Sequence, residues 1–132
     1  MRQEAEEGAE RSSLHMLVQT AKAYGITVEV HGQMPEQKAT EELFLEAAAE
    51  ALTNAVRHAD ARTLRIRFSE TGTHDQVSFQ NDGKLPEREI VEGGGLGALR
   101  RKVETAGGVM SICCRPEYTL TITITKDGGE TL

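Results

Sequence analysis

The spacing of apolar residues changes several times along the chain, and each spacing predicts one element of secondary structure. Apolar residues recur with helical periodicity in three segments, and they alternate with polar residues or run together in five shorter ones. The expected helices span residues 12–24, 40–59 and 96–106. The expected strands span residues 26–30, 63–69, 76–80, 109–114 and 118–125. Gly25 and Gly107 stand where helix C-caps are expected, and Thr40 is expected to cap the long helix.

The order of these elements predicts the fold class. Two pairs of strands follow one another with no helix between them, as in antiparallel hairpins, and the first hairpin turns at Gly72. Arg65, Arg67 and alternate threonines between residues 119 and 125 are polar, so one face of the sheet should be open and all helices should cover the other. The prediction is a two-layer α/β sandwich with a mixed, mostly antiparallel sheet, which differs from the alternating strand–helix order of a Rossmann fold.

The length of 132 residues fits one compact domain. We expect this domain to span residues 12–125. Residues 1–11 are acidic and resemble a junction or a frayed helix start, and residues 126–132 contain two glycines and are expected to form a flexible tail.

Charge and composition exclude several classes of function. The chain has 15 basic and 21 acidic residues and a net charge of -6, so its field repels polyanions. Aromatic residues make up 4% of the chain, so few side chains could stack on the bases of single-stranded nucleic acid. No apolar run reaches the ~20 residues that cross a bilayer. We therefore expect no nucleic-acid partner and no membrane contact by this chain, and the two adjacent cysteines fit a reducing cytosol.

The long helix carries a polar stripe whose members recur every fourth residue: Glu46, Glu50, Asn54 and His58. Such a stripe is either a solvated helix face or one side of a ligand site. Asn54 favours a ligand site, because asparagine is a poor residue for a helix interior. Asn54 could offer an oxygen to Mg²⁺, Glu50 could orient or deprotonate a nucleophile, and Arg57 or His58 could contact phosphate oxygens.

A second candidate site lies in the glycine-rich segment 93–97, where four of five residues are glycine. Successive backbone N–H groups can face one concavity there, and a helix that begins at about Leu96 adds the positive end of its dipole. This junction is a candidate phosphate site, although such a run can also be a simple flexible loop. It lacks the Lys-Ser/Thr ending of a P-loop.

Three segments in this order resemble the motifs of one superfamily. Residues 50–59 (EALTNAVRHA), 81–83 (NDG) and 92–108 (EGGGLGALRRKVETAGG) are similar to the asparagine box and the two glycine boxes of GHKL-type ATP-binding domains. Within that superfamily, the residues of these motifs are most similar to those of bacterial two-component sensor histidine kinases with a short lid. The resemblance covers residues 14–125 and implies the Bergerat α/β sandwich.

The resemblance also implies roles for individual residues toward ATP and Mg²⁺. Asn54 would coordinate the Mg²⁺ that bridges the ATP phosphates, Glu50 would act on the geometry of phosphoryl transfer, and Arg57 and His58 would lie near the phosphates. Asn81 falls where the family has its adenine-reading aspartate, and Gly83 would let the backbone pass under the base.

The remaining implied roles concern the lid and the last strand. Thr119 or Thr121 would face the pocket and help hold the base. The lid hinge and the phosphate-facing helix start would be formed by Gly93, Gly95, Leu96 and Gly97.

Two departures from the family pattern qualify these roles. Asn81 replaces the usual aspartate, and an amide binds adenine less strongly than a carboxylate and can turn its NH₂ group toward the base. In addition, His15 is the only histidine on an upstream helix, and Met16 follows it instead of the usual acidic residue. We therefore expect the phosphoacceptor histidine on a separate dimerisation domain upstream in a longer parent chain, with a response regulator as an indirect partner.

These expectations define one main hypothesis and two alternatives. The main one is the ATP-binding catalytic domain of a sensor histidine kinase, working in the cytosol on its own or as the cytosolic part of a membrane-bound sensor. Asn81 favours a non-catalytic, nucleotide-gated interaction module instead. The second alternative is an anti-sigma-type serine kinase. Segment 12–24 argues against this alternative, because the segment resembles the continuation of an upstream helix.

Overall fold

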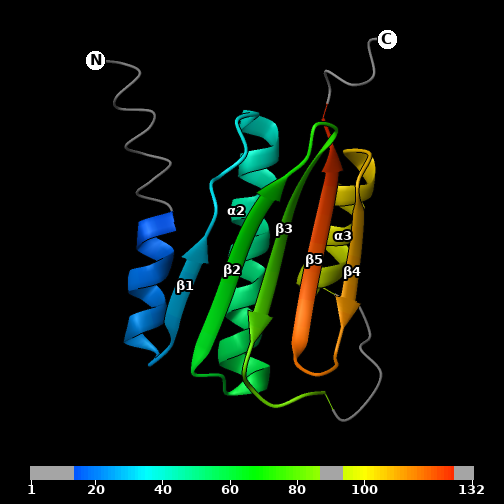
Figure 1. The fold of residues 1–132 in the computed structure, drawn as a ribbon. Coiled ribbons are helices and arrows are strands. Elements are labelled where there is room, and N and C mark those ends of the chain that lie inside the picture. The colour runs from blue at the N-terminus through cyan, green and yellow to red at the C-terminus, as the bar shows by residue number, and fades with distance from the viewer. Residues whose placement is uncertain (1–13, 87–93, 127–132) are drawn as a thin grey trace, which may run out of the picture.

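Five strands form a single sheet in the order β1-β2-β3-β5-β4 (Figure 1). The computed structural model of the chain describes residues 14–86 and 94–126. The strands are β1 (Thr27–His31), β2 (Thr63–Glu70), β3 (His74–Asn81), β4 (Val109–Cys113) and β5 (Tyr118–Thr125). β1 pairs in parallel with β2, and every other neighbouring pair is antiparallel. The expectation of a mixed, mostly antiparallel sheet is confirmed.

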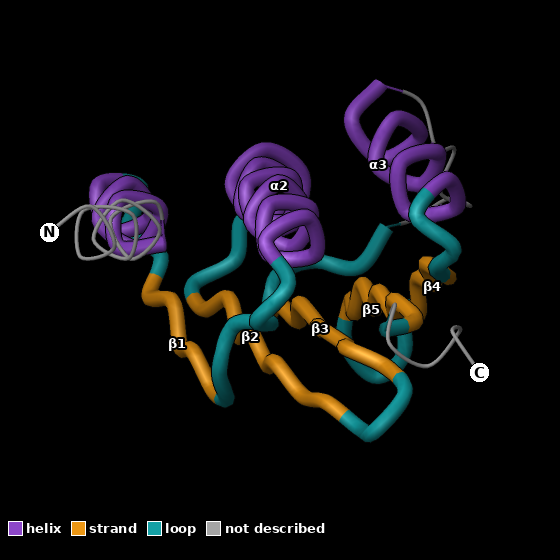
Figure 2. The backbone as a smooth tube through the Cα atoms, turned by 90° about the horizontal axis from the view of Figure 1, so that it is seen from above, coloured by secondary structure: helices purple, strands orange, loops and turns teal. Residues whose placement is uncertain are grey.

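The helices lie in one layer on one face of this sheet (Figure 2). They are a helix at residues 14–23, α2 (Lys38–Asn54) and α3 (Gly94–Thr105). The strand residues that face this layer are apolar and buried, among them Leu64, Ile66, Val77, Leu120 and Ile122. Side chains of a strand alternate between the two faces, so the polar partners of these residues lie on the uncovered face. The two-layer α/β sandwich is therefore confirmed.

The long helix differs from its expected form at both ends. α2 begins at Lys38 after the N-cap Gln37, which makes no side-chain capping bond, and Thr40 is buried inside the first turn and is not the cap. At the other end, Ala55–Ala59 form a π-helix, which closes at Asp60 in the left-handed conformation (φ 51°). Aspartate tolerates that conformation better than most residues, so the helix can end there without a glycine.

Other boundaries differ by one or two residues. β3 begins at His74, earlier than expected, because the Thr71 N–H donates to the His74 carbonyl at 2.8 Å and extends the pairing to the turn. α3 begins at Gly94, whose φ of 56° favours a glycine, and it ends with the expected Gly107 cap at φ 80°.

The sandwich has two distinct ends along the direction of α2. The hairpin end carries the β2–β3 turn and the N-terminus of α2, and the turn end carries the end of β3, the start of α3 and the C-terminus of α2 (Figure 1). Among the helices of the described residues, none combines the length and apolar character that a bilayer span requires.

Candidate functional site

Asn54, the last residue of α2, carries an unsatisfied polar group. Its side-chain amide nitrogen is buried and has no hydrogen-bond partner within residues 14–86 and 94–126. A buried polar group without a partner costs about 1–3 kcal/mol, so most native structures avoid it. The surrounding protein does not fix the orientation of this amide, and its oxygen can be turned toward a ligand. Asn54 is therefore the strongest candidate for a binding residue on this helix.

The π-helix directly after Asn54 changes where the following residues lie. A π-helical turn contains more residues than an α-helical one, so the fourfold spacing of the polar stripe does not continue through Ala55–Ala59. The side chain of Arg57 is exposed, and that of His58 lies outside what the structure describes. Single π-helical turns are frequent at functional sites, which fits the position of Asn54 at its start.

Glu46 and Glu50 on the same stripe face α3. Lys102 of α3 forms an ion pair with Glu46. The Glu50 carboxylate lies so close to Gly95 that any side chain at position 95 would overlap it. Gly95 belongs to the first turn of α3, where the helix dipole favours a nearby negative charge. Glu50 thus connects α2 with the start of the glycine-rich helix.

The turn after β3 brings Asn81 to the same end of the molecule as Asn54. Asn81 is only 3% exposed, and its Oδ1 accepts a hydrogen bond from the Gly83 N–H at 2.9 Å. Gly83 lies against Ala59, whose backbone leaves no room for a Cβ at position 83. The Lys84 N–H then donates to the Ala59 carbonyl at 2.7 Å. Gly83 is thus needed for packing of this turn on the helix end.

Asp82 fixes the other side of this turn, and the sequence patterns did not single it out. Its Oδ1 accepts hydrogen bonds from the backbone N–H groups of Arg62 (2.8 Å) and Thr63 (2.9 Å). Burial acts to raise the pKa of Asp82, but the hydrogen bonds from Thr63 and Arg62 outweigh it and lower the pKa below the ordinary 3.8. These partners become neighbours only in the folded chain, so no local sequence signal could have revealed them.

The glycine-rich segment is only partly described. Gly93 lies outside the described residues. Within α3, Leu96 is half-buried against the hydrophobic core and Gly97 is buried, while Gly95 is exposed beside Glu50. The expected helix start near Leu96 is therefore two residues too late, because glycines 94 and 95 already belong to the helix.

The expected pocket-facing positions of Thr119 and Thr121 are wrong. Both lie on the open face of the sheet, paired in register with Gln80 and Ser78, whereas the helices cover the other face. The physical reason is the strict alternation along β5. Tyr118, directly opposite Asn81 in the register, is buried on the helix side in their place.

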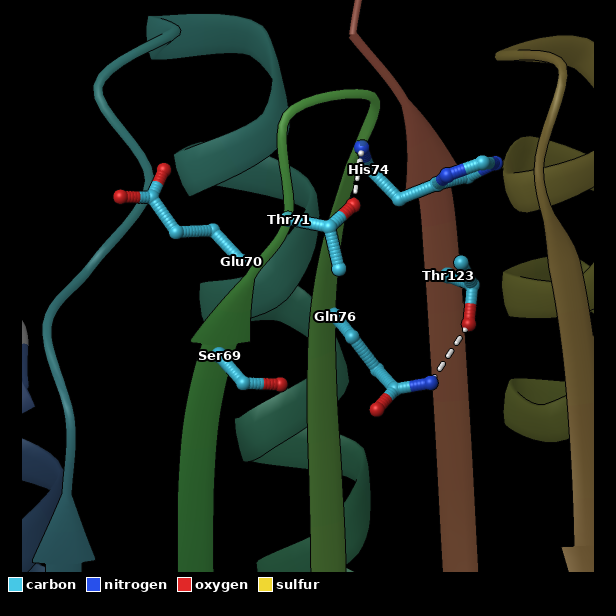
Figure 3. A pocket seen from close by; sticks show the side chains of 6 residues that line it. All are labelled: Ser69, Glu70, Thr71, His74, Gln76 and Thr123. Atoms are coloured by element: carbon cyan, nitrogen blue, oxygen red, sulfur yellow. Dashed lines mark hydrogen bonds between the residues drawn. The ribbon is translucent and has the colours of Figure 1, made fainter.

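A shallow hollow of about 270 Å³ lies elsewhere, on the open face at the hairpin end (Figure 3). Polar side chains line it, and the Gln76 amide donates to Thr123 Oγ1 at 3.0 Å across it. Its lining residues are Ser69, Glu70, Thr71, His74, Gln76 and Thr123. The hollow is separated from Asn54 and Asn81 by the length of β3, so it is no part of their site.

The described residues offer few protein ligands for a metal ion. The described residues contain no group of three or more histidine, cysteine or acidic side chains that could hold a metal ion. Among the described residues, a cation at Asn54 would find no such group, and a ligand or water could supply the remaining oxygens. Mg²⁺ in nucleotide sites is bound in this way, with few protein ligands and several phosphate oxygens.

This fold is that of histidine-kinase catalytic domains. The chain superposes on the blue-light activated histidine kinase of Erythrobacter litoralis EL346 with a TM-score of 0.69 and 21% identity, over 90% of this chain and 42% of that one. The catalytic domain of histidine kinase ThkA gives a TM-score of 0.66 and 14% identity over 91% of both chains. At these identities the likeness is one of fold.

Sequence similarity points to the same class. Sensor histidine kinase YxjM of Bacillus subtilis is 32% identical over 102 residues, which are 77% of this chain and 23% of that protein. The chain thus spans about a quarter of the length of this relative. No family model matches the chain. Fold and sequence together confirm the resemblance to the GHKL-type catalytic domains of histidine kinases, whose architecture this chain has.

Proposed function

We propose that this chain is the ATP-binding catalytic domain of a sensor histidine kinase, which positions Mg·ATP for phosphoryl transfer to a histidine on a separate domain. The observation that carries the proposal is the buried, unpartnered amide of Asn54 at the turn end. The start of α3 and the Asn81–Gly83 turn lie at that same end, so a nucleotide bound there would meet groups for its phosphates and for its base.

Asn54 would hold Mg²⁺ through its side-chain oxygen. This is chemically suitable, because Mg²⁺ prefers hard oxygen ligands and the amide has no competing partner in the described residues. The ion, when bound, neutralises charge on the phosphate oxygens. Phosphoryl transfer asks a protein mainly for positioning and charge stabilisation, and one asparagine, one glutamate and a helix start can supply these.

The α2–α3 contact would organise the phosphate side of the site. The first turn of α3 offers free backbone N–H groups and the positive end of its dipole to an anion. Glu50, whose carboxylate lies beside Gly95, is suited to control the transfer geometry. Arg57, His58, Gly93, Leu96 and Gly97 remain predicted contributors around the phosphates and the lid.

The base would lie against the Asn81–Gly83 turn, which is docked on Ala59 and therefore rigid. Asn81 is the group in this turn that can form hydrogen bonds with a purine edge. The pairing of Tyr118 with Asn81 in the sheet supports a role for Tyr118, and not for Thr119 or Thr121, at the base.

The partners follow from the class of protein. The acceptor histidine would belong to an upstream dimerisation domain of a longer parent chain, and a response regulator would receive the phosphoryl group afterwards. The domain would work in the cytosol, where ATP is supplied. Without its acceptor domain, this chain is expected to bind ATP and to hydrolyse it very slowly.

A calorimetric titration with a non-hydrolysable ATP analogue tests the proposal. We expect binding that requires Mg²⁺ and that weakens about tenfold to a hundredfold in Asn54→Ala. Gln76→Ala is the matched control, because it removes an amide at the hairpin end and should bind like the wild type. Equal affinities of wild type and Asn54→Ala, or no binding at millimolar analogue, would refute the proposal.

A further inference from the structure

The hydrogen bond within the Asn81–Gly83 turn fixes which group Asn81 can present to a ligand. A backbone N–H can only donate, so the Asn81 atom that lies 2.9 Å from the Gly83 nitrogen must be the amide oxygen. The amide nitrogen, with its two N–H donors, then points in the other direction. The side chain cannot turn over without placing two donors against each other.

The surroundings hold this turn in place. A Cβ at position 83 would overlap the Ala59 backbone, and the Lys84 N–H donates to the Ala59 carbonyl at 2.7 Å. Asp82 binds the backbone of Arg62 and Thr63 on the other side. Since Asn81 is also 3% exposed, a mismatched hydrogen bond at this residue would not be relieved by water.

An aspartate at position 81 would behave differently. One carboxylate oxygen could accept the Gly83 N–H, and the other would remain an acceptor for a ligand donor. The amide of Asn81 cannot do both, because its second group is a donor. The exchange of a carboxylate for an amide therefore reverses the hydrogen-bond character that the turn offers to a base.

We propose that this site selects a 6-oxopurine nucleoside triphosphate, with guanine or hypoxanthine as its base, over ATP. The inference rests on the proposed function, in which Asn81 forms hydrogen bonds with the purine edge, and it places the group at position 6 of that edge against Asn81. Adenine carries an amine there, which is a donor and would face the donor of Asn81. Guanine and hypoxanthine carry a carbonyl oxygen, which accepts from it. ATP remains a ligand, but a weaker one.

Competitive binding of ATP, ITP and GTP with Mg²⁺ tests the inference. ITP is the deciding probe, because its base differs from adenine in the hydrogen-bonding groups at position 6 and the adjoining ring nitrogen, while GTP adds a 2-amino group. We expect the wild type to bind ITP about tenfold more tightly than ATP, and Asn81→Asp to reverse this order. Gln76→Glu makes the same amide-to-acid exchange at the hairpin end and should leave the ratio unchanged.

The possible results separate the inference from the proposed function. If the wild type binds ATP as tightly as ITP or more tightly, the inference is overturned and the nucleotide site stands. If none of the three nucleotides binds, the proposed function fails, and the inference fails with it. Should Asn81→Asp not fold, the ITP-to-ATP ratio of the wild type alone decides.

Discussion

The two ends of the sandwich differ in how the polar groups named below are paired. At the hairpin end, Thr71 Oγ1 accepts from the His74 N–H at 3.0 Å, and the Lys126 ammonium lies 2.8 Å from a Glu70 carboxylate oxygen. At the turn end, the Asn54 amide nitrogen is buried without a partner in the described residues, and a π-helix follows α2. The named groups of the hairpin end thus pair with one another, whereas the Asn54 amide nitrogen has no such partner in the described residues.

This difference shows which features of the protein lower its stability without being required by its fold. Neither the buried amide nor the π-helical turn stabilises the sandwich, and local rules of sequence and structure are commonly broken at functional sites. A ligand that binds the Asn54 amide would offset this loss of stability. The comparison therefore favours the turn end as the place where the proposed ligand binds.

The largest effect is expected from Asn54→Ala, which separates binding from stability. Beyond the loss of nucleotide affinity, the free energy of unfolding should not fall, and it should rise by up to about 0.5 kcal/mol because alanine is the better helix former. Urea unfolding without ligand measures this. A fall of about 1 kcal/mol or more would mean that Asn54 has a structural partner, and the contrast between the ends would be lost.

A smaller effect is expected from Gly83→Ala, which tests whether the turn is docked on the helix end. The added methyl group would overlap the Ala59 backbone, so unfolding should become easier by about 1–3 kcal/mol. Gly72→Ala is the matched control, since nothing lies within 4 Å of its added Cβ. Its change should stay within about 0.5 kcal/mol. Equal stabilities of the two variants would argue against the docked turn.

Asp82→Asn should destabilise the protein at neutral pH by less than Gly83→Ala, in a pH-dependent way. The pKa of Asp82 is lowered in the folded protein, so its contribution is complete above the ordinary pKa of 3.8 and is lost as the pH falls further. The difference in unfolding free energy between wild type and variant should therefore shrink in acid. A difference in unfolding free energy that is constant down to pH 2 would show that the charge of Asp82 does not contribute to fixing this turn.

The same substitution at the hairpin end should have the opposite sign. Asp75 is 4% exposed, and burial raises its pKa; Lys126 lowers it in part, and Glu70 and Glu36 raise it. Asp75→Asn removes a buried charge, so it should stabilise the protein slightly at pH 7. This gain should fade as the pH falls through the raised pKa of the folded state, and it should be absent well below 3.8, where the carboxyl group is protonated in both states. Destabilisation at pH 7 would show that the Asp75–Lys126 attraction outweighs the burial.

The sequence alone predicted the layers of this fold better than its irregular points. Strict alternation gave β5 with the bounds Tyr118–Thr125, and the polar residues Arg65 and Arg67 correctly predicted an open sheet face. Five residues are too few to distinguish a π-helix from an α-helix by periodicity, so Ala55–Ala59 was missed. The capping role of Thr40 was wrong because tertiary burial placed this residue inside the helix.

The candidate site shows the same division. Asn54 stood out because asparagine is unfavourable inside a helix, and the structure places it at the turn end with Asn81. The resemblance assigned Thr119 and Thr121 to the pocket. The alternation of polar and apolar residues along β5 instead predicted that they lie on the open face, where the structure places them. The hydrogen bonds of Asp82 join residues about twenty positions apart, so they depend on the folded chain.

Amide chemical shifts during a titration with Mg²⁺ and nucleoside triphosphate test the central claim most directly, because they report on both ends at once. The account predicts shifts at Asn54, Asn81, Gly83 and Gly95, and unchanged signals at Thr71, His74 and Gln76. Shifts concentrated at the hairpin end, or none at saturating nucleotide, would contradict it.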